Sequence, residues 1–400
     1  MKKMIFSAVA FAVVAVSAVA VAPTTSEAVP AFARQTGAAC LNCHFQAIPR
    51  LTTFGRNFSM SGMRDMGEQG LLEDDHMSLP AVFNAGFLMK VLVRSQTGLI
   101  GVGDNTGIMI PDESAIFIGG RYGEHVGGLT EVSTNNGGGV AQAKLNYVWD
   151  TDFGHVNLAM VSGDVGAGVL FSDPSNAVRH TNRAAIHRAL ALEKTVMMAS
   201  GITGFGLSAF ANDSIYVSVN AFASASPAEL TGAYGSLKGL STLVRGAYIA
   251  EVGGLEAVLG GFYASAKSSN FQGGPGGLGV ASAAKQYGVD LQLQGDVGDV
   301  SVGFYLPYVI KGEMQDLNTS STSGGQAMLT VGMGHAGVKL GYDWMTDKAA
   351  GVASVKTTQP YFGAWYSVAQ NVELELAHIS TKVTGAASVA TTTLVIEYVY

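Results

Sequence analysis

Residues 289–294 read Val-Asp-Leu-Gln-Leu-Gln, so an apolar side chain is followed by a polar one at every step. Successive side chains point to opposite faces of a β-strand, and this pattern therefore predicts a strand with one apolar and one polar face. The same alternation recurs at 144–150, 215–220 and 372–376. A soluble β-sandwich has the same period, so alternation alone leaves two architectures open.

The connections between the strands separate these architectures. Short turns are predicted near Gly123, Asp152, Asn212-Asp213, Gly253, Gly298-Asp299, His335-Ala336 and Gln370. Longer polar or glycine-rich links are predicted at 95–113, 135–138, 164–199, 224–238, 268–283, 312–325, 347–354 and 383–388. Regular alternation of short and long connections is typical of outer-membrane barrels, which have an even number of strands. The predicted fold class is all-β, with residues 79–400 forming a porin-like transmembrane antiparallel β-barrel of about 16 strands.

Composition and the last residues agree with a barrel in the bacterial outer membrane. The chain is 48% hydrophobic and only 13% charged, yet it has no helix-length apolar run beyond its first residues. Leu394, Ile396, Tyr398 and Tyr400 form one apolar face, which is similar to the aromatic-ended last strand of bacterial outer-membrane proteins. A net charge of −7 disfavours nucleic acid as a partner and leaves outer-membrane lipid as the expected surroundings.

The N-terminus predicts export. Lys2 and Lys3 precede an apolar run from residue 4 to about residue 22, and small or polar residues continue to Ala28. This arrangement is typical of a signal peptide, predicted at 1–28, with a membrane-anchoring helix as the alternative. Residues 29–78 then form a separate short segment before the barrel.

That segment holds the only two cysteines of the chain, in the sequence Cys40-Leu41-Asn42-Cys43-His44. A C-x-x-C-H sequence predicts covalent attachment of one haem c through both thiols, with His44 as an axial ligand of the haem iron. A zinc site would need further soft ligands, and a redox dithiol is expected beside a βαβ unit. Haem is therefore the favoured cofactor, and export is the condition that its attachment requires.

The remaining haem contacts stay open at the level of sequence. The sixth ligand is undecided, and the candidates within reach along the chain are Met60, Met63, Met66, His76 and Met77. Arg34 and Arg56 are candidates to pair with haem propionates, with a solvated surface role as the alternative. Phe45, Phe54 and Phe58 are candidates to pack on the haem or in an ordinary core.

Residues 30–58 resemble a known family. The matching positions are Pro30 to Gly37, Cys40 to His44, Pro49, Leu51, Phe54-Gly55-Arg56 and Phe58. They are similar to the monohaem cytochrome–porin fusions in the outer membrane of iron-oxidising bacteria, from which Ile48, Ser59 and Met63 depart. The resemblance implies an Fe(II):cytochrome c oxidoreductase-like electron transfer protein. Such a protein oxidises extracellular Fe(II) at the haem and passes electrons to a periplasmic c-type cytochrome.

The sequence does not clearly indicate an entry site for iron. Inward-facing carboxylates are predicted at Asp290, Asp343, Glu373, Glu375 and Glu397, and the first loop carries Asp104, Asp112 and Glu113. Oxygen ligands suit Fe(II), but porin lumens are polar in any case. Two other functions therefore stay open: a solute porin with a haem-bearing plug or another redox role, and a periplasmic cytochrome with a soluble sandwich.

Overall fold

The computed structural model describes residues 31–46, 50–67, 69–75, 78–98, 104–135, 139–163, 202–223, 240–267, 283–315, 320–349, 353–369 and 371–399. The predicted signal peptide, His76, Met77 and the whole of the link at 164–199 lie outside this range. Within it, no helix is both long enough and apolar enough to cross a membrane.

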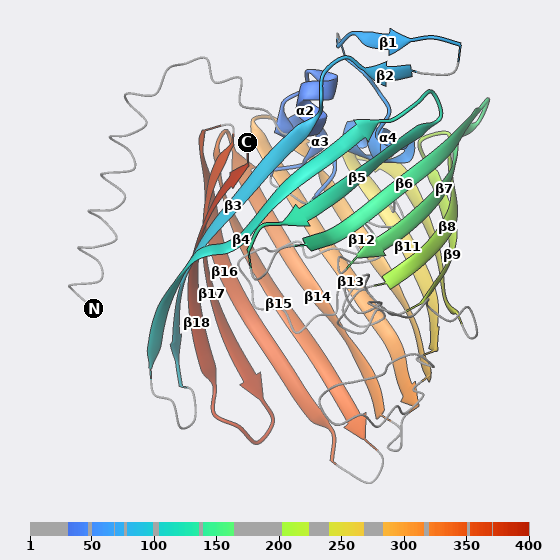
Figure 1. Cartoon of the computed structure of the whole chain (residues 1–400). Coiled ribbons are helices and arrows are strands. Elements are labelled where there is room, and N and C mark those ends of the chain that lie inside the picture. The colour runs from blue at the N-terminus through green and yellow to red at the C-terminus, as the bar shows by residue number, and fades with distance from the viewer. Residues whose placement is uncertain are drawn as a thin grey trace.

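Sixteen strands of the described residues form one closed antiparallel barrel, which confirms the predicted fold class (Figure 1). The strands are β3 (Ala85–Thr97), β4 (Asn105–Arg121), β5 (Val126–Ser133), β6 (Gly139–Thr151), β7 (Gly154–Gly163), β8 (Ile202–Ala211), β9 (Ile215–Ala223), β10 (Ser241–Val252), β11 (Leu255–Lys267), β12 (Ala283–Val297), β13 (Val300–Gln315), β14 (Ser320–Met333), β15 (Ala336–Ala349), β16 (Val355–Ala369), β17 (Val372–Val383) and β18 (Val389–Val399). Each strand pairs with its neighbour in the chain, and β18 pairs with β3 to close the ring. No sheet edge is left open in this barrel, so its ladder groups are paired within the fold.

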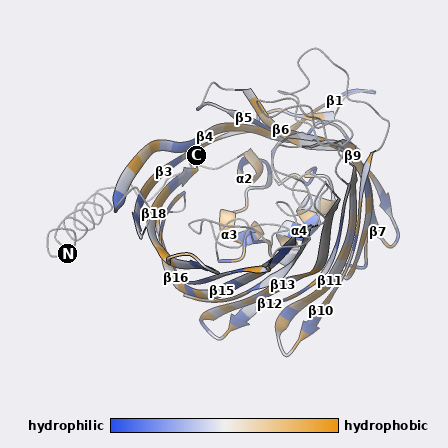
Figure 2. Ribbon diagram, turned by 90° about the horizontal axis from the view of Figure 1, so that it is seen from below, coloured by the Kyte–Doolittle hydropathy of each residue, from blue (hydrophilic) through white to orange (hydrophobic). Residues whose placement is uncertain are grey.

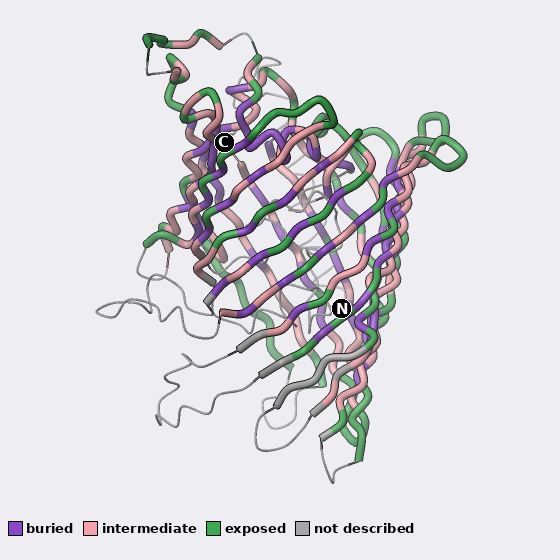
Figure 3. The backbone as a smooth tube through the Cα atoms, turned by 90° about the vertical axis from the view of Figure 1, so that its right-hand side faces the viewer, coloured by how far each residue is buried: buried purple, intermediate pink, exposed green. Residues whose placement is uncertain are grey.

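The alternation of side chains is the pattern that the sequence predicted. In β12, Val289 is exposed outside while Asp290, Gln292 and Gln294 are buried toward the lumen. In β9, Val217 is likewise exposed and Ser218 is buried. Figure 3 shows this alternation along neighbouring strands of the wall. An apolar exterior with a polar interior is the inverse of a soluble core and suits a lipid surrounding.

The turns are placed as predicted, whereas two of the links are shorter than expected. Turns fall between consecutive strands at residues 152–153, 212–214, 253–254, 298–299 and 334–335. The links predicted at 95–113 and 312–325 are wrong in extent, because β3 and β4 together cover all but 98–104, and β13 and β14 leave only 316–319. Asp112 and Glu113 therefore belong to β4 and not to the first loop. Strand pairing outweighs the local glycine and polar content that indicated loops at these positions.

The segment before the barrel lies inside its mouth. Three short helices, α2 (Ala31–Thr36), α3 (Cys40–Cys43) and α4 (Thr53–Met60), precede the hairpin of β1 (Leu71–Glu73) and β2 (Ser78–Pro80). The helices sit at the end of the barrel that carries the short turns and the C-terminal end of β18 (Figure 1). Seen along the axis they lie within the ring of strands (Figure 2). We call residues 31–67 the plug.

Candidate functional site

Both cysteines lie on one helical turn of the plug. His44 follows directly, and its main-chain N–H donates to the Cys40 carbonyl at 2.9 Å. The turn packs closely on α4 because Gly55 of that helix has no side chain. A Cβ at Gly55 would lie 2.1 Å from the Cys43 carbonyl oxygen. The side chains of Cys40 and Cys43 are part-buried and form no disulfide. The turn therefore presents two free thiols and an imidazole together.

The protonation state of the thiols distinguishes the chemistries open to this pair. Burial raises the pKa of the Cys40 thiol above its usual value. Burial, and then the neighbouring Cys40, raise the pKa of Cys43 to about 11. Reactive redox dithiols show the opposite shift, because their thiolate is stabilised. Burial thus favours the protonated thiols of Cys40 and Cys43, in contrast to the stabilised thiolate of a redox dithiol.

The ring of His44 is oriented by the main chain of the same segment. Its Nδ1 lies 3.2 Å from the carbonyl oxygen of Arg50, and the two segments also meet in a β-bridge between His44 and Leu51. A carbonyl oxygen only accepts hydrogen bonds, so this contact requires the proton on Nδ1 and places the ring lone pair on Nε2. A hydrogen bond from the second ring nitrogen to a carbonyl is the arrangement that orients metal-binding histidines.

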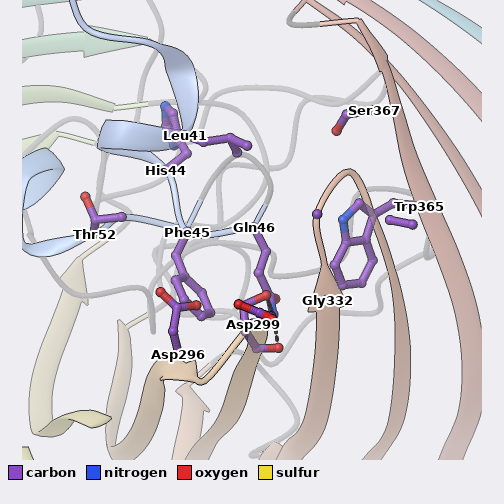
Figure 4. A pocket seen from close by; sticks show the side chains of 13 residues that line it. Leu41, His44, Phe45, Gln46, Thr52, Asp296, Asp299, Gly332, Trp365 and Ser367 are labelled. Atoms are coloured by element: carbon purple, nitrogen blue, oxygen red, sulfur yellow. Dashed lines mark hydrogen bonds between the residues drawn. The ribbon is translucent and has the colours of Figure 1, made fainter. Parts of the chain in front are cut away.

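His44 borders a cavity of about 250 Å³ between the plug and the barrel wall (Figure 4). The plug contributes Leu41, His44, Phe45, Gln46 and Thr52. The barrel contributes Asp296, Asp299, Ser301, Gly332, Gly334, Ala336, Trp365 and Ser367. The indole of Trp365 faces the plug across this space. Asp296, near the end of β12, and Asp299, in the turn that follows, are both exposed. The barrel side of the cavity is thus apolar at Trp365 and acidic at Asp296 and Asp299.

The candidates for the sixth ligand are distributed over different parts of the plug. Met60 is fully buried in an apolar cluster with residues of β8 to β11, among them Phe210 and Tyr216. Met63 belongs to a separate cluster with Phe58 and Leu129. Met66 is half-buried, and none of these three methionines lines the cavity beside His44.

The arginines and phenylalanines that the sequence analysis proposed as haem contacts lie in different surroundings. Arg34 donates to the carbonyl of Ala85 at 2.6 Å, and Arg56 forms an ion pair with Glu256 at 2.5 Å. Both guanidinium groups are therefore used to fix the plug to the barrel. The three phenylalanines divide as follows: Phe45 lines the cavity, Phe54 is 47% exposed and Phe58 packs edge-to-face on Phe32.

Further polar contacts tie the plug to strands around the ring. Gln35 is fully buried, donates to the carbonyls of Met63 and Asp65 at 2.8 Å and accepts from the N–H of Arg121 at 2.9 Å. Arg64 binds Asp150 of β6 through one nitrogen at 2.8 and 3.1 Å. Sequence reasoning missed these contacts because each joins residues far apart in the chain and no local pattern marks them.

The inward carboxylates of the wall do not assemble into one metal site. Asp290 pairs with Arg245 at 2.6 Å, Glu375 pairs with Lys339, and Glu113 pairs with Lys90. Within the described ranges, no group of three or more His, Cys, Asp or Glu side chains is placed to hold a metal ion. The polar lumen that the sequence predicted is present, and Asp290 and Glu375 of its wall are each paired with a cation.

Comparison with known proteins identifies the fold. No protein-family model and no curated protein matches the chain. Among solved structures, a loop-deletion mutant of OmpT, an outer membrane protein of Vibrio cholerae, aligns with a TM-score of 0.57 at 12% identity, covering 80% of this chain and 99% of that one. The outer membrane channel DcaP of Acinetobacter baumannii aligns with 0.54 at 11% identity, covering 83% and 100%. OprB of Pseudomonas putida aligns with 0.54 at 11% identity, covering 80% and 94%. The chain has the closed antiparallel barrel fold of these proteins.

Proposed function

We propose that the plug carries one haem c. Cys40 and Cys43 would hold it through thioether bonds, and Nε2 of His44 would be an axial ligand of its iron. The donor set fits the group: two free thiols lie on one turn, the Nδ1 contact with Arg50 places the lone pair of His44 on Nε2, and a cavity adjoins the ring. Once bound, the haem supplies one-electron chemistry.

We further propose that the protein is an electron conduit of the outer membrane that oxidises extracellular Fe(II) and reduces a periplasmic c-type cytochrome. The observation that carries this proposal is the position of the plug, whose contacts reach β4, β6, β11 and β13 around the ring. A plugged barrel obstructs solutes but leaves a path for electrons if a redox group sits in the plug. Fe(II) would then reach the plug from the external side, and Fe(III) would stay outside the periplasm.

A solute porin with a haem-bearing plug or another redox role is the second candidate. It is favoured by the comparisons, since the similar solved structures include an outer membrane channel. The polar lumen wall also suits the passage of solutes. The two candidates differ in one measurable property, which is whether small ions cross the barrel together with the electron.

Liposomes that contain the purified protein test both candidates. Fe(II) is added outside, oxidised cytochrome c is enclosed inside, and the absorbance of reduced cytochrome c and the internal iron content are followed together. Reduction of cytochrome c without iron entry is the result expected for a conduit. Entry of iron with the electron would favour the porin, and absence of haem reduction by Fe(II) would overturn the iron assignment. The variant Cys40→Ala with Cys43→Ala is the control, because it keeps the barrel and removes the attachment sites.

A further inference from the structure

Arg50 is a buried cation beside the site, and neither the sequence analysis nor the proposed function uses it. Its side chain is 3% exposed, and its Nε donates to the carbonyl of Phe45 at 3.2 Å. The guanidinium lies over two barrel rings, 5.8 Å from the centroid of Tyr305 and 5.6 Å from that of Trp365. Phe45 and Trp365 both line the cavity, so the guanidinium contacts two of the residues that line it.

The same residue is joined to the proposed axial ligand through its main chain. The carbonyl oxygen of Arg50 is the partner of His44 Nδ1, and the next residue, Leu51, forms a β-bridge with His44. A hydrogen bond between the Phe45 N–H and the Arg50 carbonyl, 2.9 Å long, closes this loop. The position of the guanidinium relative to the His44 ring is therefore fixed by short covalent and hydrogen-bonded links.

The charge of Arg50 is only partly balanced by its neighbours. Among the described residues, Arg50 forms no ion pair, and its Nη1 is buried without a hydrogen-bond partner. The side chains that interact with it electrostatically include Tyr305, Lys339 and Tyr361 of the facing wall. Lys339 adds a second positive charge, although Glu375 pairs with it. An arginine buried in this way keeps its proton and acts as a fixed positive charge.

We propose that Arg50 is a positioning residue whose buried charge raises the reduction potential of the haem held by Cys40, Cys43 and His44. Reduction of a ferric haem adds one electron and lowers the charge of the iron–porphyrin by one unit. A fixed positive charge nearby stabilises the ferrous state relative to the ferric state, so it favours acceptance of an electron. A higher potential increases the driving force for electron transfer from Fe(II) to the haem. This inference rests on the proposed function, since it presumes the covalent haem.

The test is a redox titration of the purified, haem-loaded protein, followed by its visible absorbance, for the wild type, Arg50→Met and Arg50→Lys. All variants keep the main-chain carbonyl that binds His44, and Met keeps an unbranched apolar side chain in place of the aliphatic part of Arg50. At a fixed potential, Arg50→Met should lower the ratio of ferrous to ferric haem about tenfold, which is the effect of a unit charge acting over a separation on the order of 10 Å at an effective dielectric constant near 20. Tenfold corresponds to about 59 mV for a one-electron couple. Arg50→Lys should stay close to the wild type.

Equal shifts in Arg50→Met and Arg50→Lys would show that charge is not the cause and would overturn the inference, as would the absence of a shift. Arg50→Gln replaces Arg50→Met in the comparison if the methionine variant fails to assemble. Lys285→Gln removes one positive charge at the opposite end of the barrel, on β12, and should leave the potential unchanged. A wild-type protein without covalent haem would instead contradict the proposed function, so the two failures are distinguishable.

Discussion

The barrel and the plug are stabilised by different kinds of contact: main-chain hydrogen bonds in the barrel, and individual side chains in the plug. Each barrel strand pairs with the strand next to it in sequence through a ladder of main-chain hydrogen bonds, and side chains only decide which face is turned outward. The plug has three short helices and a few main-chain bonds of its own. It is fixed by individual side chains such as Gln35, Arg56 and Arg64, each reaching a barrel residue far away in sequence. Substitutions in the plug should therefore alter the site while the barrel persists.

The largest effect is expected from removing both thiols. Cys40→Ala with Cys43→Ala should abolish covalent haem, because no other cysteine exists in the chain. The barrel should still form, since neither thiol contributes to a strand ladder. Denaturing gels stained for haem peroxidase activity measure the first effect, and the mobility of unheated samples in detergent gels measures the second. A stained band in the double variant would refute the attachment sites.

The next largest effect concerns the ion pair that joins α4 to β11. Arg56 is 1% exposed and Glu256 is 17% exposed, and Thr53 donates to the same carboxylate at 2.6 Å. Glu256→Gln leaves a buried guanidinium without its counter-charge, which typically costs about 3–5 kcal/mol. The plug should then leave the mouth more often, and single-channel conductance in planar bilayers should rise. Glu251→Gln, an exposed carboxylate on the same hairpin, is the matched control, and equal conductance in both variants would contradict the role of the pair.

The two regions also differ in how much of each the sequence predicts. The barrel follows from period-two patterns such as 289–294 and from turn residues, because both are local and repeat along the chain. The Cys40 to His44 motif is local too, so its three chemical groups were identified without the structure. The roles of Arg50 and Arg56 were not, because their partners lie on barrel strands more than a hundred residues away. Contacts of that kind depend on the closed tertiary structure.

A smaller effect is expected where α3 and α4 touch. A Cβ at Gly55 would lie 2.1 Å from the Cys43 carbonyl oxygen, so Gly55→Ala must move one helix away from the other. Overpacking of this kind typically costs about 1–3 kcal/mol. We expect a lower yield of haem-stained protein at an unchanged yield of barrel. Gly107→Ala in β4, where a Cβ would meet no atom within 4 Å, is the control and should match the wild type.

The smallest effect is expected at the second ion pair of the plug. Arg64 is buried, but Asp150 is 52% exposed, so water screens the charge that binds it. Asp150 also contacts His155 at 2.8 Å, which gives the carboxylate a partner outside the plug. Asp150→Asn keeps a hydrogen-bond acceptor and should destabilise the plug by about 1 kcal/mol or less. The rise in single-channel conductance should therefore be clearly smaller than for Glu256→Gln. Asp152→Asn, in the exposed turn two residues further on, should have no effect. A larger rise in conductance for Asp150→Asn than for Glu256→Gln would contradict this order. It would show that the exposed fraction of the carboxylate does not determine how strongly an ion pair holds the plug, and that the Arg64 pair contributes more than the Arg56 pair.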